Sequence, residues 1–260
     1  MGSSNKARQR AAEARAAEES AQKRRQRIIN FSIGGVLVLV VLAIVGGAFL
    51  TSQSNQQADK PNPDAAIPAG TIPTGQDYEY GVPKNEASGK PVLEIWEDFQ
   101  CPACAQFEAI FGSTVSEIAE KDLARVIWRS TSFLDANFPG QNSQRAAAAW
   151  GCAVDAGKKT EYHDLVYANQ PANEGDGWTQ EQLIGFGDQA GIKGDDFTTF
   201  EQCVVDKTYM QWAANGTIAM AEAGVGGTPG LFLDGEELTD EQRSSPDALL
   251  QAVQEAGKSE

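Results

Sequence analysis

Apolar and polar positions follow three patterns along the chain, and the first is a continuous uncharged run from Ile28 to Leu50. As a helix, these 23 residues would measure about 34 Å, enough to cross the roughly 30 Å hydrocarbon core of a membrane. The basic cluster Lys23–Arg27 precedes the run, whereas almost no basic residues follow it closely. This asymmetry predicts a transmembrane helix over residues 28–50, with the basic tail 1–27 in the cytoplasm and the rest of the chain extracytoplasmic.

A cleaved signal peptide is the alternative interpretation of this segment. The apolar core of a signal peptide has roughly 7–15 residues, so the run is too long, and the leader before it is unusually extended. Both features favour a single-pass anchor in the cell membrane, and under either interpretation the rest of the chain is exported. Residues 51–77 lack periodicity and are rich in turn formers and small polar residues, which predicts a linker.

The second pattern begins near residue 78 and indicates one globular domain that extends to residue 260 and is large enough to bury a core. An apolar strand-like run over Pro91–Trp96 is followed by helical periodicity to about Lys121. A second strand-like run then covers Ala124–Trp128. This order indicates a β-α-β unit, in which two parallel strands lie in a covered sheet.

Helical periodicity is the third pattern and dominates residues 135–223, where no strand is expected. Residues 226–236 then have the pattern of a strand, an Asp-Gly turn and a strand, and Pro246–Ala256 that of a helix with Ser245 as its N-cap. The expected fold class is therefore α/β with an inserted all-helical block. The helices expected in the block are Gln144–Ala156, Thr160–Tyr167, Thr179–Ala190, Asp195–Cys203 and Lys207–Ala223.

The charges are distributed unevenly between the tail and the domain. The chain has 260 residues, with 36 acidic and 21 basic side chains and a net charge of −15. The tail 1–27 holds eight Lys and Arg residues against three Glu, so its charge is +5 and residues 28–260 carry −20. A domain this acidic is a poor binder of nucleic acid, and we expect no such partner.

The candidate chemistry lies between the first strand and the first helix, at Cys101-Pro102-Ala103-Cys104. Two cysteines three positions apart on the first turn of a helix can close into a small disulfide and reopen without backbone rearrangement. Cys101 would lie at the helix N-terminus, where unpaired N–H groups and the helix dipole stabilise a thiolate. We therefore expect Cys101 to be the nucleophile and Cys104, one turn deeper, to be the resolving thiol.

The same spacing also occurs in zinc sites, but zinc would need two further ligands. The other candidates, Cys152, Cys203 and the sole histidine His163, stand in none of the usual paired spacings. We therefore expect no metal. A purely structural disulfide between Cys101 and Cys104 is disfavoured, because so small a loop constrains the unfolded chain little.

The globular domain resembles the DsbA-like thiol–disulfide oxidoreductases, the membrane-anchored exported bacterial members in particular. The resemblance covers roughly residues 78–256 and implies a thioredoxin fold with an inserted helical domain over about residues 135–223. Here that fold would be preceded by the expected transmembrane helix. The features that carry the resemblance are Asp98–Cys104, the segment from Glu161–Leu165 to Asn169-Gln170, Gly224–Pro229, and the helical insertion between these motifs.

The resemblance also implies the other members of the site. Thr228 and Pro229 would be joined by a cis peptide bond that faces the thiols, and the backbone of Thr228 would pair with an extended substrate. Cys152 and Cys203 would form a structural disulfide, which an even cysteine count in an exported protein also favours; two free buried thiols are the alternative. No cofactor is expected. His163 is interpreted as a packing residue outside the site.

Two positions depart from the family pattern. Many relatives have an acidic proton acceptor for the resolving thiol six positions before the first cysteine, and Ile95 occupies that position here. Glu97 shares the strand face of Ile95, so we assign the role to Glu97. Ala103 stands where the strongest oxidants of the family have histidine, so no positive charge there stabilises the Cys101 thiolate. We expect a redox potential between those of thioredoxin and DsbA, about −270 and about −120 mV.

The function expected from these features is disulfide formation in exported proteins that carry free thiols. The resemblance implies reoxidation by a membrane quinone-linked partner of the DsbB or vitamin K epoxide reductase-like (VKOR-like) type. A reductase or isomerase would use the same residues but would need an electron donor. A non-redox metal- or peptide-binding module would use the two cysteines as ligands or not at all.

Overall fold

The computed structural model describes residues 64–73 and 79–258, all of which belong to one compact unit, Lys60–Glu260. The predicted tail 1–27, the predicted transmembrane helix 28–50 and the first part of the predicted linker lie outside these residues. Across the two described ranges, no helix is both long enough and apolar enough to cross a membrane.

The centre of the unit is a mixed sheet with the strand order β1-β2-β4-β3-β5-β6. The central strand β3 (Val92–Asp98) runs parallel to β4 (Arg125–Thr131) and antiparallel to β5 (Gly230–Leu233). The parallel pair is the one that the β-α-β pattern predicts. The outer strands are β1 (Ile72–Pro73), β2 (Glu79–Pro83) and β6 (Glu236–Glu237).

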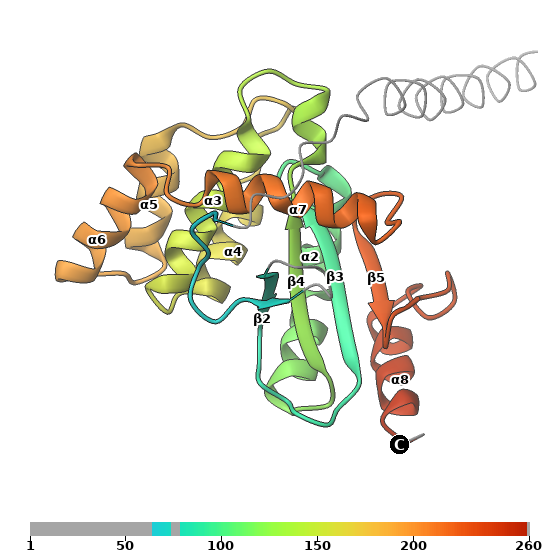
Figure 1. Ribbon diagram of the computed structural model, residues 1–260. Helices are drawn as coiled ribbons and strands as arrows, with labels where there is room; N and C mark the ends of the chain where they lie inside the picture. Colours follow the sequence, from blue (N-terminus) through green and yellow to red (C-terminus); the bar gives the residue numbers. More distant parts are fainter. Residues whose placement is uncertain (1–63, 74–78, 259–260) are drawn as a thin grey trace, which may run out of the picture. The chain divides into compact units, whose positions relative to one another are not determined.

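Three helices cover the sheet: two of them contact its strands, and the third packs beside one of these two. Helix α2 (Pro102–Glu120) packs beside α8 (Pro246–Ala256), and α7 (Met210–Glu222) packs on β4 and β2. Figure 1 shows α7 crossing in front of the strands, whereas α2 lies behind them. The sheet is therefore covered on both faces, as parallel strands require.

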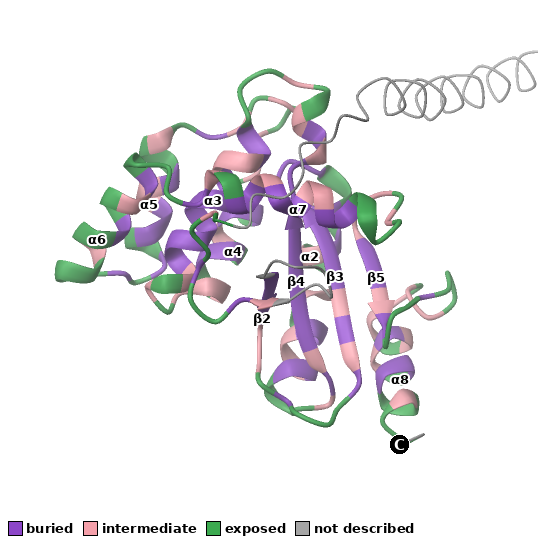
Figure 2. Cartoon of the chain, in the orientation of Figure 1, coloured by how far each residue is buried: buried purple, intermediate pink, exposed green. Residues whose placement is uncertain are grey.

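The helical insertion follows β4 and precedes α7; the expected block 135–223 also included α7, which packs on β4 and β2 as well as on α3. Its helices cover the predicted segments to within a few residues, because the apolar periodicity of each marks the buried face. Figure 2 shows this burial on α3 and α4, while α5 and α6 expose their outer sides. The elements are the 3₁₀ helix η1 (Phe133–Ala136), α3 (Asn142–Asp155), α4 (Lys159–Ala168), α5 (Gln180–Gln189) and α6 (Gly194–Val205).

Aromatic side chains join the insertion to the sheet. Trp128 of β4 meets Trp150 of α3 edge to face at 6.1 Å, and Trp150 lies 6.2 Å from Trp212 of α7. All three are fully buried. Ring pairs in this geometry add to the free energy gained from area burial, so the insertion and the sheet share one core.

A disulfide connects α3 and α6 inside the insertion. Cys152 and Cys203 are bonded, with their Cα atoms 5.9 Å apart and a sequence separation of 51. Cys152 is buried and Cys203 is half-buried beside it. The pair lies in the helical insertion, whereas the other two cysteines, Cys101 and Cys104 at the N-terminus of α2, are free thiols.

The folded unit begins earlier than residue 78. Strand β1 pairs antiparallel with β2, and the backbone N–H of Ala69 donates to the carboxylate of Asp155 on α3 at 2.7 Å. Residues 64–73, which belong to the segment predicted as linker, therefore lie against the domain. Neither β1 nor β2 has a sequence pattern that predicts a strand, because β1 has two residues and β2 contains Gly81 and Pro83; Tyr80 and Val82 hold β2 through burial.

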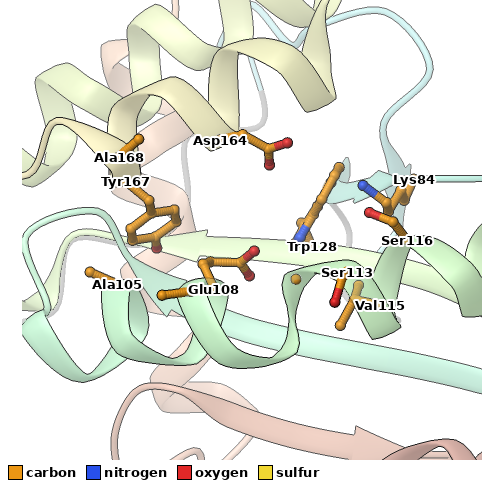
Figure 3. A pocket seen from close by; sticks show the side chains of 12 residues that line it. Lys84, Ala105, Glu108, Ser113, Val115, Ser116, Trp128, Asp164, Tyr167 and Ala168 are labelled. Carbon is orange, nitrogen blue, oxygen red and sulfur yellow. The ribbon is translucent and has the colours of Figure 1, made fainter. Parts of the chain in front are cut away.

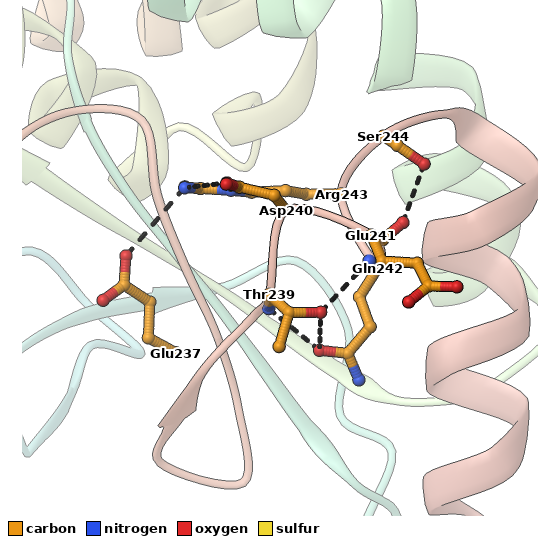
Figure 4. A network of polar contacts seen from close by, with 7 residues as sticks. All are labelled: Glu237, Thr239, Asp240, Glu241, Gln242, Arg243 and Ser244. Carbon is orange, nitrogen blue, oxygen red and sulfur yellow. Dashed lines mark hydrogen bonds and ion pairs between the residues drawn. The ribbon is translucent and has the colours of Figure 1, made fainter.

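The connection from β6 to α8 is held by local polar contacts, shown in Figure 4. Thr239 and Gln242 exchange hydrogen bonds between side chain and backbone in both directions. Arg243 pairs with Asp240 at 2.7 Å. Helix α8 then begins at its predicted cap, where the Ser245 hydroxyl accepts from Ala248 N at 3.2 Å.

Candidate active site

The two thiols lie where β3 ends and α2 begins. Cys101 is the N-cap of α2, with an extended backbone at φ −71° and ψ 117°, and Pro102 occupies the first helical turn. Cys101 is 7% exposed and Cys104 is 0% exposed, whereas Pro102 and Ala103 between them are exposed. The chain thus presents one thiol at the surface edge and holds the other beneath it.

Hydrogen bonding lowers the pKa of Cys101 to about 6. The largest cause is the bond from the Cys104 thiol, and the side chain of Thr228 and the N–H groups of Cys104 and Ala103 act in the same direction; burial opposes them. These donors all stabilise the thiolate more than the thiol. The N–H groups belong to the first turn of α2, so the predicted effect of the helix N-terminus is present in the geometry.

Burial raises the pKa of Cys104 far above the usual range, and the neighbouring Cys101 and the charge of Glu97 raise it further. Near neutral pH, Cys101 is therefore the thiolate and Cys104 is the protonated thiol. Because the thiolate is the attacking species, the two cysteines have different reactivities that follow from their depth.

Thr228 and Pro229 face the nucleophile. The peptide bond between them is cis, and the Cys101 thiol donates to the carbonyl oxygen of Thr228 at 3.4 Å. The Thr228 hydroxyl is buried beside Cys101 and is not engaged by another group among the described residues, so it can donate to the thiolate and thereby lower its pKa. The structure thus places Thr228 and Pro229 beside Cys101 and Cys104, although the two pairs are far apart in sequence.

Glu97 lies behind the thiols in a buried polar cluster. It is 2% exposed, and its Oε1 lies 3.1 Å from Nε2 of His163 on α4. Its Oε2 has no hydrogen-bond partner within the described chain. The sequence predicted His163 to be a packing residue outside the site. In the structure it contacts the Glu97 carboxylate, whose charge raises the pKa of Cys104. Its separation of 66 positions from Glu97 leaves no sequence signal for this contact.

The protonation states of this cluster follow from its burial and charge. Burial alone would lower the pKa of His163, but the negative charge of Glu97 and the hydrogen bonds that the ring donates to the carboxylates of Asp164 and Glu97 raise it to about 10. Burial and the charge of Glu97 raise the pKa of Glu108 to about 8. At neutral pH His163 is therefore a cation and Glu108 is mostly a neutral acid.

A cavity of about 410 Å³ opens beside this cluster between α2 and α4. Figure 3 shows Glu108 of α2 facing Asp164 and Tyr167 of α4 across it, with Lys84 and Trp128 at the other end. Glu108 lines this cavity, which therefore places the buried cluster near solvent.

Glu97, Glu108 and His163 are the described residues that could hold a metal ion. One ligand atom from each lies within 4.8 Å of the others. A metal would have to displace the protons that His163 and Glu108 hold at neutral pH, because metal ligands bind in their deprotonated forms. The cluster is therefore better suited to proton exchange than to metal binding.

The loop that leads into Cys101 is held by the carboxylate of Asp98. This carboxylate accepts from the Ser143 hydroxyl of α3, from Gln100 N and from Leu134 N. Burial raises the pKa of Asp98 to about 7, and these hydrogen bonds oppose the rise. The sequence indicates Asp98 only as part of the Asp98–Cys104 motif. The structure places its carboxylate between the redox turn and the helical insertion.

Comparison with known proteins identifies the family. A family model described as thioredoxin matches residues 84–255, so the chain belongs to the thioredoxin family. No protein of curated function matches the sequence. Solved structures are more informative about the type of member.

DsbA from Mycobacterium tuberculosis, in its reduced form, is similar with a TM-score of 0.56 at 26% identity, over 74% of this chain and 89% of that chain. The disulfide bond oxidoreductase DsbG from the same organism has a TM-score of 0.56 and 26% sequence identity, over 75% of this chain and 89% of that chain. BdbD from Bacillus subtilis has a TM-score of 0.58 and 16% sequence identity, over 75% of this chain and 100% of that chain. This similarity shows a shared fold. The chain is a DsbA-like thiol–disulfide oxidoreductase of the thioredoxin superfamily.

Proposed function

We propose that the chain is an exported, membrane-anchored enzyme that forms disulfides in exported proteins through Cys101 and Cys104. The observation that carries this proposal is the asymmetry of the two thiols: the pKa of Cys101 is lowered to about 6, whereas burial raises that of Cys104. A stabilised thiolate favours the reduced enzyme, and a dithiol that prefers to be reduced is an oxidant of other thiols.

The exchange proceeds in two attacks. A substrate thiolate attacks Cys101 Sγ of the oxidised enzyme, the bond between Cys101 and Cys104 breaks, and Cys104 leaves and takes up a proton. The second substrate thiolate then attacks the substrate sulfur of the mixed disulfide, so Cys101 leaves as a thiolate. The substrate dithiol loses two electrons to the enzyme and two protons in all: one proton ends on Cys104, and the other goes to solvent because Cys101 remains a thiolate near neutral pH.

Thr228, Pro229 and Glu97 have supporting roles in this scheme. The backbone of Thr228 lies beside Cys101 and would pair with an extended substrate segment, while Pro229 has no N–H to compete with it. Glu97, buried against His163, would take up the proton of Cys104 whenever that thiol attacks. The Cys152–Cys203 disulfide would stabilise the insertion without taking part in exchange.

Reoxidation needs an electron acceptor, and we assign this role to a membrane quinone-linked partner of the DsbB or VKOR-like type. The sequence of residues 28–50, an uncharged run behind a basic cluster, supports an anchor that would hold the enzyme beside such a partner. That anchor would leave the N-terminus cytoplasmic and the catalytic domain extracytoplasmic.

The direction of exchange is tested by equilibrating the full-length chain with glutathione buffers and reading the Cys101–Cys104 pair by mass spectrometry. A Cys101 pKa of about 6 lies between those of thioredoxin, about 7, and DsbA, about 3.5. We therefore expect a potential between about −270 and −120 mV, together with oxidation of a two-cysteine peptide by the oxidised chain. A potential at or below that of thioredoxin would instead identify a reductase.

A further inference from the structure

The segment that follows α4 reaches back to the redox turn through one side chain. The half-buried Gln170 donates from Nε2 to the carbonyl oxygen of Phe99 at 2.8 Å and to that of Cys101 at 3.0 Å. Both hydrogens of the Gln170 amide are therefore used, and the two carbonyls that accept them belong to the residues on either side of Gln100. This bridge connects the helical insertion to the turn between β3 and α2.

The position of Gln170 is itself fixed. Its backbone N–H donates to the carbonyl of Tyr167 at 3.1 Å, and the carbonyl of the preceding Asn169 accepts from the Trp178 indole at 2.8 Å. Trp178 is 3% exposed. The side chain thus extends from a peptide unit whose C=O and N–H are both hydrogen-bonded, which reduces the conformational entropy that its two hydrogen bonds cost.

The Cys101 carbonyl has three donors. Besides Gln170, it accepts from Cys104 N at 3.1 Å and Ala105 N at 3.2 Å, which are the first hydrogen bonds of α2. The orientation of this carbonyl fixes ψ of Cys101, and ψ decides how the first-turn N–H groups stand relative to Cys101 Sγ. Two of these groups, those of Cys104 and Ala103, help to lower the pKa of Cys101.

We propose that Gln170 is a positioning residue for the nucleophile: by fixing the Cys101 carbonyl, it holds Cys101 Sγ against the N–H groups of the first turn of α2. The helical insertion is then part of the redox site. This inference rests on the proposed role of Cys101 as nucleophile, and it adds a residue that does not touch substrate. A role in stability alone would leave the reactivity of Cys101 unchanged.

The test uses Gln170→Met, which keeps the length and volume of the side chain but removes both donors. The full-length chain, purified in detergent and reduced, is alkylated with iodoacetamide from pH 4 to 9, and mass spectrometry follows Cys101 alone. We expect the midpoint of the alkylation profile to rise by about 0.5 to 1 pH unit, a three- to tenfold loss of thiolate below the midpoint.

The matched control is Gln144→Met. Gln144 lies in the same insertion, and its Nε2 donates to the carbonyl of Met210 at 2.7 Å, away from the redox turn. Its midpoint should equal that of the unchanged chain. An unchanged midpoint in Gln170→Met, or equal shifts in both variants, would overturn the inference.

If Gln170→Met does not fold, Gln170→Asn is measured in its place, because it keeps the amide but is one methylene too short to reach both carbonyls. The same shift is then expected, and its absence would again overturn the inference. The proposed function fails in a different way: in the unchanged chain, Cys104 would be alkylated before Cys101.

Discussion

At the scale of single residues, the surroundings of Cys101 make its reactivity depend on pH in a way that Cys104 does not share. The pKa of Cys101 is lowered to about 6, so its alkylation by iodoacetamide should reach half its maximal rate near pH 6 and stay high at pH 7 and above. Cys104 should stay unreactive throughout this range because burial raises its pKa. A Cys101 midpoint near that of free cysteine, about 8.5, would remove the basis of the asymmetry.

The same lowered pKa has a consequence for stability. A thiol whose pKa is depressed in the folded state stabilises that state above its unfolded pKa, and this stabilisation is lost as pH falls through about 6. The melting temperature of the reduced chain minus that of Cys101→Ser should therefore increase from pH 5 to pH 8. A difference that is constant with pH would show that the folded thiolate is not stabilised.

Glu97 should matter when Cys104 attacks a mixed disulfide on Cys101. Glu97→Gln cannot accept the proton, so release of glutathione from a preformed Cys101 mixed disulfide should slow by about 100-fold, within the usual range for general base catalysis. The matched control is Glu94→Gln on the same strand. Glu94 pairs with Arg129 on the opposite face of the sheet. Equal rates in the two variants would exclude Glu97 as the proton acceptor.

The sequence predicted part of this site. Cys101 and Cys104 are recognisable because their spacing is local, and Thr228 and Pro229 because they stand in a motif. The roles of His163, Glu108 and Gln170 follow from contacts between α4, α2 and β3, and no local pattern reports such contacts. The sequence around His163 is also typical of a packing residue, since Leu165 and Val166 follow it closely on the same helix.

At the scale of secondary structure elements, the disulfide between α3 and α6 is expected to contribute stability and not chemistry. Closing a loop of 51 positions is worth about 4 kcal/mol in the chain-entropy model. Cys152→Ser with Cys203→Ser should therefore lower the melting temperature while oxidation of a two-cysteine peptide persists in the folded fraction. Loss of all exchange in the folded variant would assign the pair a role in the reaction.

Helix α7 lies against the sheet at a position that admits only glycine. A Cβ on Gly216 would stand 1.8 Å from the Tyr80 hydroxyl and 2.4 Å from the backbone carbonyl of Ser130. Gly216→Ala should therefore destabilise the fold by about 3 kcal/mol in urea unfolding, because the backbone of β4 cannot move away.

The control is Gly185→Ala on α5, where an added Cβ meets nothing within 4 Å in the described chain. It should stabilise by about 0.5 to 1 kcal/mol, since alanine loses less conformational entropy in a helix. If both variants destabilised equally, α7 would not pack as closely on β4 as the structure indicates.

The elements differ in how well the sequence predicts them. Helices α3 to α8 show apolar periodicity over at least ten residues, and the predicted ranges agree with the structure to within a few positions. Strands β1 and β2 owe their existence to pairing with each other and with β4. Such pairing joins residues far apart in sequence and leaves no local pattern.

At the scale of the whole molecule, the orientation of the chain in the membrane follows from the basic cluster before residue 28. In spheroplasts, an external protease should remove an epitope at the C-terminus and leave one within residues 1–27 intact. Permeabilised spheroplasts provide the control, since both epitopes should then be lost. Cleavage of the N-terminal epitope in intact spheroplasts would reverse the proposed topology.

The central claim concerns the whole enzyme, namely that Cys101 attacks and is attacked while Cys104 resolves. Cys101→Ser and Cys104→Ser are each incubated with a substrate protein that carries free thiols, under oxidising conditions, and separated on a non-reducing gel. Cys104→Ser should accumulate covalent complexes that Cys104 would otherwise resolve, and Cys101→Ser should form none. Complexes that form through Cys104 in the Cys101→Ser variant, with none in Cys104→Ser, would contradict the account.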